Sequence, residues 1–233
     1  MRHFEQELEK LNATLLEMSA LVENAVYRSV QGVVEKNEDL AREVLKNEGR
    51  VNELEIEIDD QAISLLALQQ PVAADLRLVT VAIKINNDLE RMGDLAVSIA
   101  ERALALVKEP VVQPMIDIPH IAGLVQSMVR KALDAFVTRD AELARSVLAS
   151  DDAVDNLRTA SYHELVSFME KDASHIPQAL NLWSVVRNLE RIADHSTNIA
   201  EDVLFLVKGI DVRHHNEQRL TANTPEEAAT GKQ

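Results

Sequence analysis

Apolar residues recur along the chain in steps of three and four, the spacing that places them on one face of an α-helix. The first stripe runs from Phe4 to Val33 with a period near 3.5 residues and predicts one long amphipathic helix. That period fits either a coiled coil or a bundle helix. The shorter elements that follow favour the bundle.

Two more helices are predicted in the first half of the chain. A turn at Lys36-Asn37 precedes a second stripe between Leu40 and Leu68. Pro71 suits the first turn of a third helix, because an amide hydrogen is not needed there. The third helix is expected to run to about Val107, before Glu109-Pro110.

The helical pattern restarts after a proline-rich stretch. Residues 110–119 hold three prolines and predict a stiff connection. Three helices are expected beyond it, at 121–136, from Ala141 to about Met169, and at Pro177–Val207 with Gly209 as the C-cap. The expected organisation is therefore a first three-helix bundle over 1–109, the connection at 110–119, a second bundle over 120–212 and a disordered tail over 213–233.

An internal repeat links the third and the sixth helix. NNDLERMGDLAVSIAE at 86–101 and VRNLERIADHSTNIAE at 186–201 agree at seven of sixteen positions. Ordinary residue frequencies would give about one agreement. The repeat predicts an all-α fold of two tandem three-helix bundles related by a pseudo-twofold. A single continuous six-helix bundle is the alternative.

Composition and charge exclude several classes of protein. Six glycines, six prolines and 3% aromatic residues disfavour all-β sandwiches and barrels. The formal charge of −15 would repel nucleic acid, so basic protein surfaces or cations are the expected partners. The chain has no cysteine, and no signal peptide or membrane-spanning run is visible in it, so we expect a cytoplasmic protein without membrane insertion.

The repeat preserves an acidic pair in each copy, Glu90 with Asp94 and Glu190 with Asp194. Residues four apart project from the same side of a helix, and like charges at this spacing repel each other. The plainer interpretation is a solvated helix flank, because the chain has 39 acidic residues. A bound cation would compensate the repulsion, as would Arg91 or Arg191, which we interpret as ion-pair partners rather than catalytic groups.

Helices two and five carry a second set of oxygen-bearing pairs, at an offset of 103 residues. Glu48 and Asn52 align with Asp151 and Asp155. Neighbouring helices in each bundle could bring these pairs to face the pairs of the repeat. Carboxylates without cysteine or histidine suit hard cations such as Mg²⁺, Mn²⁺ or iron.

Other candidate sites are weaker. His195 points about 100° away from Asp194 and is expected to be a surface histidine. Gly93 is interpreted as a site of close helix packing, and Trp183 as a packing residue with an interface role as the alternative. No Glu-x-x-His sequence occurs, which argues against ferritin-like di-iron chemistry. No phosphate-binding loop and no nucleophile with a base is recognised.

The combination of these motifs strongly resembles the PhoU family of phosphate-specific transport accessory proteins. The resemblance rests on three segments: the two LER-x-x-D stretches, the segment QPVAADLR at 70–77, and the ending NIAEDVLFLVKGIDVRH at 198–214. It implies a cytoplasmic homodimer that negatively regulates the phosphate-starvation response. The implied partners are the ATPase subunit of the phosphate ABC transporter and a PhoR-type sensor histidine kinase, through which the protein would associate peripherally with the inner membrane.

The resemblance also implies bound metal, as iron, zinc, manganese or magnesium. The first site would use Glu48, Asn52, Glu90 and Asp94, and the second Asp151, Asp155, Glu190 and Asp194. Asn52 departs from the acidic pattern of the family and lowers the charge of the first site. We therefore expect the second site to bind metal more tightly.

The leading hypothesis is a non-catalytic regulatory adaptor with metal on acidic helix faces. A metal-dependent enzyme or a metal-storage protein built on the same clusters is the first alternative. A structural helical protein without metal is the second.

Overall fold

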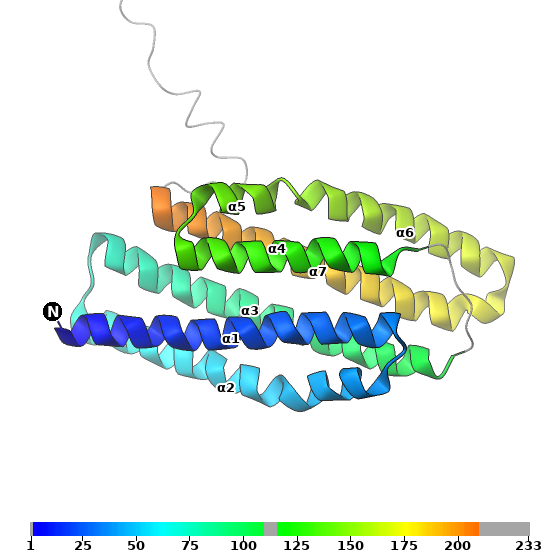
Figure 1. The fold of residues 1–233 in the computed structure, drawn as a ribbon, viewed down its shortest axis with the longest axis horizontal. Coiled ribbons are helices and arrows are strands. Elements are labelled where there is room, and N and C mark those ends of the chain that lie inside the picture. Colours follow the sequence, from blue (N-terminus) through cyan, green and yellow to red (C-terminus); the bar gives the residue numbers. More distant parts are fainter. Residues whose placement is uncertain (1, 110–115, 210–233) are drawn as a thin grey trace, which may run out of the picture.

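The computed structural model describes residues 2–109 and 116–209, in which every regular element is a helix (Figure 1). The first bundle consists of α1 (Arg2–Val34), α2 (Glu38–Gln69) and α3 (Ala73–Val107). The second consists of α4 (Ile118–Thr138), α5 (Ala141–Leu148), α6 (Asp151–Lys171), the short 3₁₀ helix η1 (Ala173–His175) and α7 (Ile176–Lys208). The predicted all-α fold of two tandem three-helix bundles is confirmed, with the middle helix of the second bundle in two pieces. The predicted tail and most of the proline-rich connection lie outside the described residues.

The helix ends follow local capping chemistry. The Asn37 side chain accepts hydrogen bonds from the amides of Asp39 and Leu40, at 3.0 and 3.3 Å, and so starts α2. Lys36 adopts a φ of 51° and reverses the chain before it. Gly209, at a φ of 69°, ends α7 as predicted.

The prediction of one helix from Ala141 to about Met169 was wrong in one respect. The chain breaks between α5 and α6, where the Ser150 hydroxyl donates to the carbonyl of Ser146 at 2.9 Å. Asp151 and Asp152 then occupy the first turn of α6. Acidic residues after a serine favour a helix N-terminus, because they face the free amides of the first turn.

Two prolines lie at places other than those predicted. Pro71 precedes α3 rather than opening it, because Gln70 ends α2 in the left-handed region and two further residues complete the turn. Ala73, the first residue of α3, also has a positive φ of 48°. Pro119 lies in the first turn of α4 and not in the connection.

Helices α3 and α7 form the centre of the molecule and pack against each other as well as within their own bundles. Sixteen of the 35 residues of α3 are buried, against seven of the 32 residues of α2. Two-sided burial explains the difference. The buried apolar side chains of both bundles form one continuous core.

Pairs of polar side chains join α3 and α7 across this central contact and follow the symmetry of the repeat. We call these pairs the polar seam. Asn198 donates to Asp88 at 3.2 Å, and Asn188 donates to Ser98 at 2.9 Å. Since 88 and 98 shifted by 100 give 188 and 198, the same contact is made twice with the helices exchanged. The pseudo-twofold therefore passes between α3 and α7.

Two further contacts of the seam break the symmetry. Lys84 pairs with Asp202 at 2.7 Å, and His195 Nδ1 lies 2.7 Å from Asp88. The expectation that His195 is a surface residue was wrong, since its side chain is only 17% exposed. The His195 side chain lies about 100° around α7 from that of Asp194. Since α7 is buried on two sides, this places the His195 side chain toward α3.

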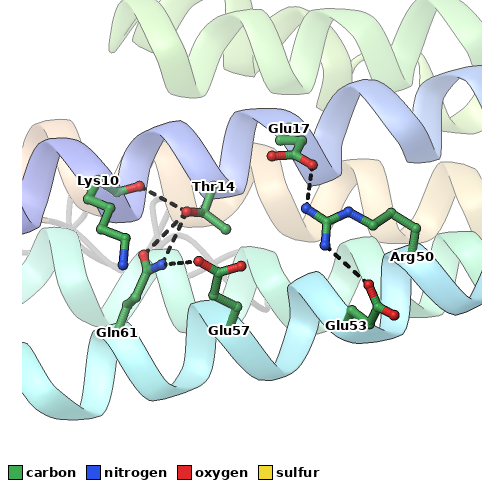
Figure 2. A network of polar contacts seen from close by, with 7 residues as sticks. All are labelled: Lys10, Thr14, Glu17, Arg50, Glu53, Glu57 and Gln61. Carbon is green, nitrogen blue, oxygen red and sulfur yellow. Dashed lines mark hydrogen bonds and ion pairs between the residues drawn. The ribbon is translucent and has the colours of Figure 1, made fainter.

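The outer contact between α1 and α2 is closed by a different kind of polar network (Figure 2). Arg50 on α2 reaches Glu17 on α1 at 2.7 Å and Glu53 at 3.2 Å. Gln61 on α2 donates to Thr14 on α1 at 3.2 Å. Exposed pairs of this kind add little stability, so the seam between α3 and α7 is the more consequential polar contact.

Asp88→Ala should lower the free energy of unfolding by about 1–3 kcal/mol, because it leaves His195 and Asn198 without their acceptor. Urea unfolding followed by circular dichroism measures the change. Asp60→Ala, at an exposed helical aspartate of α2, is the matched control and should stay within about 0.5 kcal/mol of the parent. Equal losses in the two variants would contradict this view of the seam.

Candidate functional site

The second acidic cluster combines one end of α6 with the middle of α7. Asp151 and Asp155 lie in the first turns of α6, and Glu190 and Asp194 lie one turn apart on α7. The structure places these four side chains together, since the charges of the other three all act on the carboxyl of Asp194.

Burial and mutual repulsion disfavour full ionisation of this cluster. They raise the pKa of Asp194 to about 6, with burial as the largest cause, then the charges of Glu190, Asp151 and Asp155; His195 opposes the shift. Burial also raises the pKa of Asp151, with Asp155, Asp152 and Glu190 adding to it. A cation placed among these oxygens would relieve the repulsion.

Arg158 is a member of this cluster that sequence analysis missed. Its Nε lies 3.2 Å from Glu190 and 3.7 Å from Asp155, so the guanidinium bridges α6 and α7. Its spacing of three residues from Asp155 was the available signal. The contact with Glu190 is visible only in the folded chain.

The first cluster lies around a small cavity between the helices of the first bundle. Glu48, Asn52 and Asp94 line this cavity, whose volume of about 30 Å³ holds one or two water-sized groups. Arg28 of α1 lines the same cavity. Its guanidinium is already engaged, since it donates to Asn24 at 2.6 Å and pairs with Glu43.

Glu90 is not among the residues that line this cavity, but it interacts with Asp94, which is. Burial raises the pKa of Glu90, as do Asp94, which also shares a hydrogen bond with it, and Glu55. Arg91 opposes the shift and lies 3.4 Å from Glu90, which agrees with the ion-pair role expected of that arginine. The first cluster is therefore also a place where negative charge is poorly compensated.

The two clusters differ at two aligned positions. At the offset of 103 residues, Asn52 aligns with Asp155, and Glu55 aligns with Arg158. Glu55 supplies the first cluster with the carboxylate that Asn52 lacks. Each cluster therefore contains four carboxylates. The arginines differ as well: Arg158 bridges two carboxylates of the second cluster, whereas at the first cluster Arg28 pairs with Glu43 and Arg91 with Glu90.

The tight approach of helices beside the first cavity depends on Gly93. A Cβ atom at this position would lie 3.3 Å from Cγ1 of Val51. The interpretation of Gly93 as a close-packing residue is confirmed. The packing role of Trp183 is confirmed as well, since it contacts the core and meets the Tyr162 ring edge-on with centroids 5.3 Å apart.

The donor chemistry of both clusters fits a hard cation. Carboxylate oxygens with one amide oxygen are the ligands that magnesium, manganese or iron accept. Within residues 2–109 and 116–209, however, no three acidic or histidine side chains converge closely enough to hold one ion as they stand. Binding would require the side chains to rotate inward and, in the second cluster, Arg158 to move aside.

Comparison with known proteins gives a consistent result. A family model described as the PhoU domain matches twice, at residues 15–103 and 118–203. The phosphate-specific transport system accessory protein PhoU homologs of Pseudomonas putida and Aquifex aeolicus are 40% and 37% identical to the chain. These matches cover 95% and 91% of this chain, and 87% and 96% of the relatives.

Solved structures agree with the sequence relatives. The crystal structure of PhoU from Pseudomonas aeruginosa is similar at a TM-score of 0.87 and 40% identity, covering 89% of this chain and 100% of that one. The phosphate transport system regulatory protein PhoU from Streptococcus pneumoniae matches at a TM-score of 0.82 and 28% identity, covering 90% and 99%.

Asp194→Asn should flatten the pH dependence of stability of the metal-free protein. Between the ordinary aspartate pKa of 3.8 and about 6, the native carboxyl binds a proton that the unfolded chain releases, so stability falls as the pH rises through this window. The variant removes that fall. At pH 7 it should gain roughly 0.2–0.5 kcal/mol, the size of a relieved like-charge pair.

Thermal unfolding at pH 4 to 7 in the presence of chelator measures this effect. Asp134→Asn removes an exposed helical aspartate outside the clusters and serves as the control. A parental slope in Asp194→Asn would contradict the prediction.

Proposed function

The chain belongs to the PhoU family, and from this premise we propose that it regulates phosphate uptake and phosphate-starvation signalling as a non-catalytic adaptor. The carrying observation is the double match of the PhoU domain, which spans most of both bundles. The curated relatives are named accessory proteins of phosphate-specific transport, which supports the same role at the level of transport.

The non-catalytic assignment agrees with those names and with the chemistry of the clusters. The charged and amide side chains described at the clusters are carboxylates, Asn52 and the arginines Arg28, Arg91 and Arg158, with no nucleophile beside a base among them. The alternative of a metal-dependent enzyme or a metal store gains no support from the relatives. An adaptor needs surfaces rather than a reaction centre, and the acidic clusters provide charged ones.

The proposed partners are the ATPase subunit of the phosphate ABC transporter and a PhoR-type sensor histidine kinase, which the protein would restrain. None of the helices in the two described ranges is long and apolar enough to cross a membrane. Attachment to the inner membrane would therefore run through the partners, from the cytoplasm. Formation of a homodimer remains a prediction of the family resemblance.

Metal binding at the two clusters is part of the proposal. Glu48, Asn52, Glu90 and Asp94 would hold one cation, and Asp151, Asp155, Glu190 and Asp194 another. A cation supplies positive charge where burial, together with repulsion between carboxylates, raises the pKa values of Glu90, Asp151 and Asp194. Because each set of ligands joins two helices, bound metal would tie α2 to α3 and α6 to α7.

Elemental analysis of protein purified without chelator tests the metal proposal. Glu190→Ala with Asp194→Ala should lose about half of the bound metal, because one of two sites loses two ligands. Glu5→Ala with Glu9→Ala removes an exposed acidic pair of the same spacing on α1 and should keep the parental content. Equal metal in both double variants, or none in the parent, would refute the assignment.

Direct binding tests the adaptor role. The purified chain should bind the transporter ATPase and the cytoplasmic region of the sensor kinase of the same organism, measured by biolayer interferometry. Deletion of the gene should raise expression of phosphate-starvation genes when phosphate is plentiful. Absence of binding to both proteins, together with unchanged expression, would overturn the proposed function.

A further inference from the structure

The second acidic cluster already contains a positive charge that joins its two helices. Nε of Arg158 on α6 lies 3.2 Å from a carboxylate oxygen of Glu190 on α7 and 3.7 Å from one of Asp155. Glu190 and Asp155 are two of the four ligands proposed for metal in this cluster. A metal ion that used both carboxylates would therefore have to replace the guanidinium.

The guanidinium is held in a way that permits this exchange. Among the described residues, its buried Nε finds an ion-pair partner but no hydrogen-bond acceptor. The Arg158 side chain as a whole is 36% exposed and that of Asp155 is 52% exposed, so the arginine can turn into solvent without crossing the core. Ion pairs this open contribute little to stability. Arg158 is thus an occupant that a more highly charged cation can displace.

Arg158 compensates only part of the cluster. It contacts Asp155 and Glu190, whereas the carboxyls of Asp151 and Asp194 keep pKa values above the ordinary range, because of burial first and neighbouring negative charge second. The cluster therefore still attracts a cation. That cation, however, meets a positive charge beside two of its ligands.

The arginines at the first cluster do not join its ligands in this way. Arg28 lines the small cavity, but its guanidinium pairs with Glu43 and donates to Asn24, neither of which is a proposed ligand. Arg91 lies 3.4 Å from Glu90, which is its neighbour in sequence on the same helix. Neither contact ties a ligand of one helix to a ligand of the next.

The position aligned with Arg158 has the opposite charge in the first bundle. At the offset of 103 residues it is Glu55, whose charge acts on Glu90. A cation that enters the first cluster is attracted by this residue, whereas one that enters the second cluster is repelled by the arginine. A change from carboxylate to guanidinium alters the local charge by more than the replacement of Asp155 by Asn52 does. The exchange therefore outweighs the missing carboxylate of the first ligand set.

We infer that Arg158 is the built-in counter-cation of the second cluster and sets the order in which the two clusters bind metal. The first cluster binds a hard divalent cation such as Mn²⁺ more tightly, and the second binds it only by displacing the guanidinium. This order is the reverse of the one expected from the ligand sets alone. The inference rests on the metal binding in the proposed function, and it makes the two bundles respond to different cation concentrations.

Manganese titration of chelator-treated full-length protein, followed by isothermal titration calorimetry, tests the order of binding. Glu90→Gln with Asp94→Asn removes two ligands of the first cluster and defines the second-cluster background. Glu190→Gln with Asp194→Asn defines the first-cluster background in the same way. We expect the first-cluster background to bind Mn²⁺ more tightly.

The role of Arg158 is tested within the second-cluster background. Arg158→Gln should raise the affinity for Mn²⁺ at least about tenfold, because it removes a like charge beside two ligands. Arg158→Lys keeps the positive charge and should change the affinity by no more than about threefold. Arg130→Gln is the matched control, since Arg130 pairs with Glu23 outside both clusters, and it should leave the affinity unchanged.

Thermal unfolding separates this role from a structural one. Without metal, Arg158→Gln should unfold at a lower temperature than its background, because two carboxylates lose their partner. The rise in unfolding temperature on adding Mn²⁺ should be larger in Arg158→Gln, since tighter binding stabilises the folded state more. A structural arginine would lower the unfolding temperature and leave the effect of Mn²⁺ unchanged.

Equal affinity of Arg158→Gln and its background would overturn the inference and leave metal binding intact. The same holds for tighter binding in the second-cluster background than in the first-cluster background. A gain in Arg130→Gln equal to that in Arg158→Gln would also overturn it, because the effect would then come from net charge. Absence of Mn²⁺ binding in every variant would overturn both this inference and the metal proposal.

Discussion

The architecture depends on the burial of α3 and α7 on two sides. A helix that packs only within its own bundle can leave half of its surface polar, but these two also pack against each other. Asp88 and Asn188 on the shared face are buried and must find hydrogen-bond partners, because an unsatisfied buried group costs about 1–3 kcal/mol. The reciprocal pairs Asp88 with Asn198 and Ser98 with Asn188 meet this requirement. They also fix the register of the two bundles.

The same constraint explains where the acidic pairs lie. With two faces of each central helix buried, the repeated acidic pairs lie at the rim that faces α2 in one bundle and α6 in the other. Glu90 and Glu190 are accordingly half-buried, and each meets carboxylates from the neighbouring helix. Their repulsion is a consequence of the packing and is compensated differently in the two halves. Arg158 pairs with Glu190 in the second cluster, whereas the first has Arg91 beside Glu90 and Arg28 at its cavity, already paired with Glu43.

Local patterns in the sequence predicted most of the fold. The periodic apolar stripes predicted six helical regions, and the repeat predicted the two-bundle organisation. Both patterns are formed by residues that lie close together in the chain. Several features escaped prediction, among them the break before Asp151, the burial of His195 and the bridge made by Arg158. The burial of His195 depends on the contact of α7 with α3, and the bridge of Arg158 on that of α6 with α7, neither of which a single stripe reveals. The expectation that the acidic pairs of neighbouring helices face each other agrees with the electrostatic contacts of Glu90 and Asp194, while their role as metal ligands stays a prediction. The charge that Glu55 adds to the first cluster depends on the contact of α2 with α3, which no single stripe reveals.

The first acidic cluster also involves α1. Asn24 and Arg28 of this helix line the small cavity beside Asp94. Asn24 accepts a hydrogen bond from Arg28, whose guanidinium also pairs with Glu43 of α2. A cation that entered the cavity would repel this guanidinium. Metal at the first cluster would therefore act on all three helices of the first bundle, whereas metal at the second would act on α6 and α7 and on the Arg158 bridge between them.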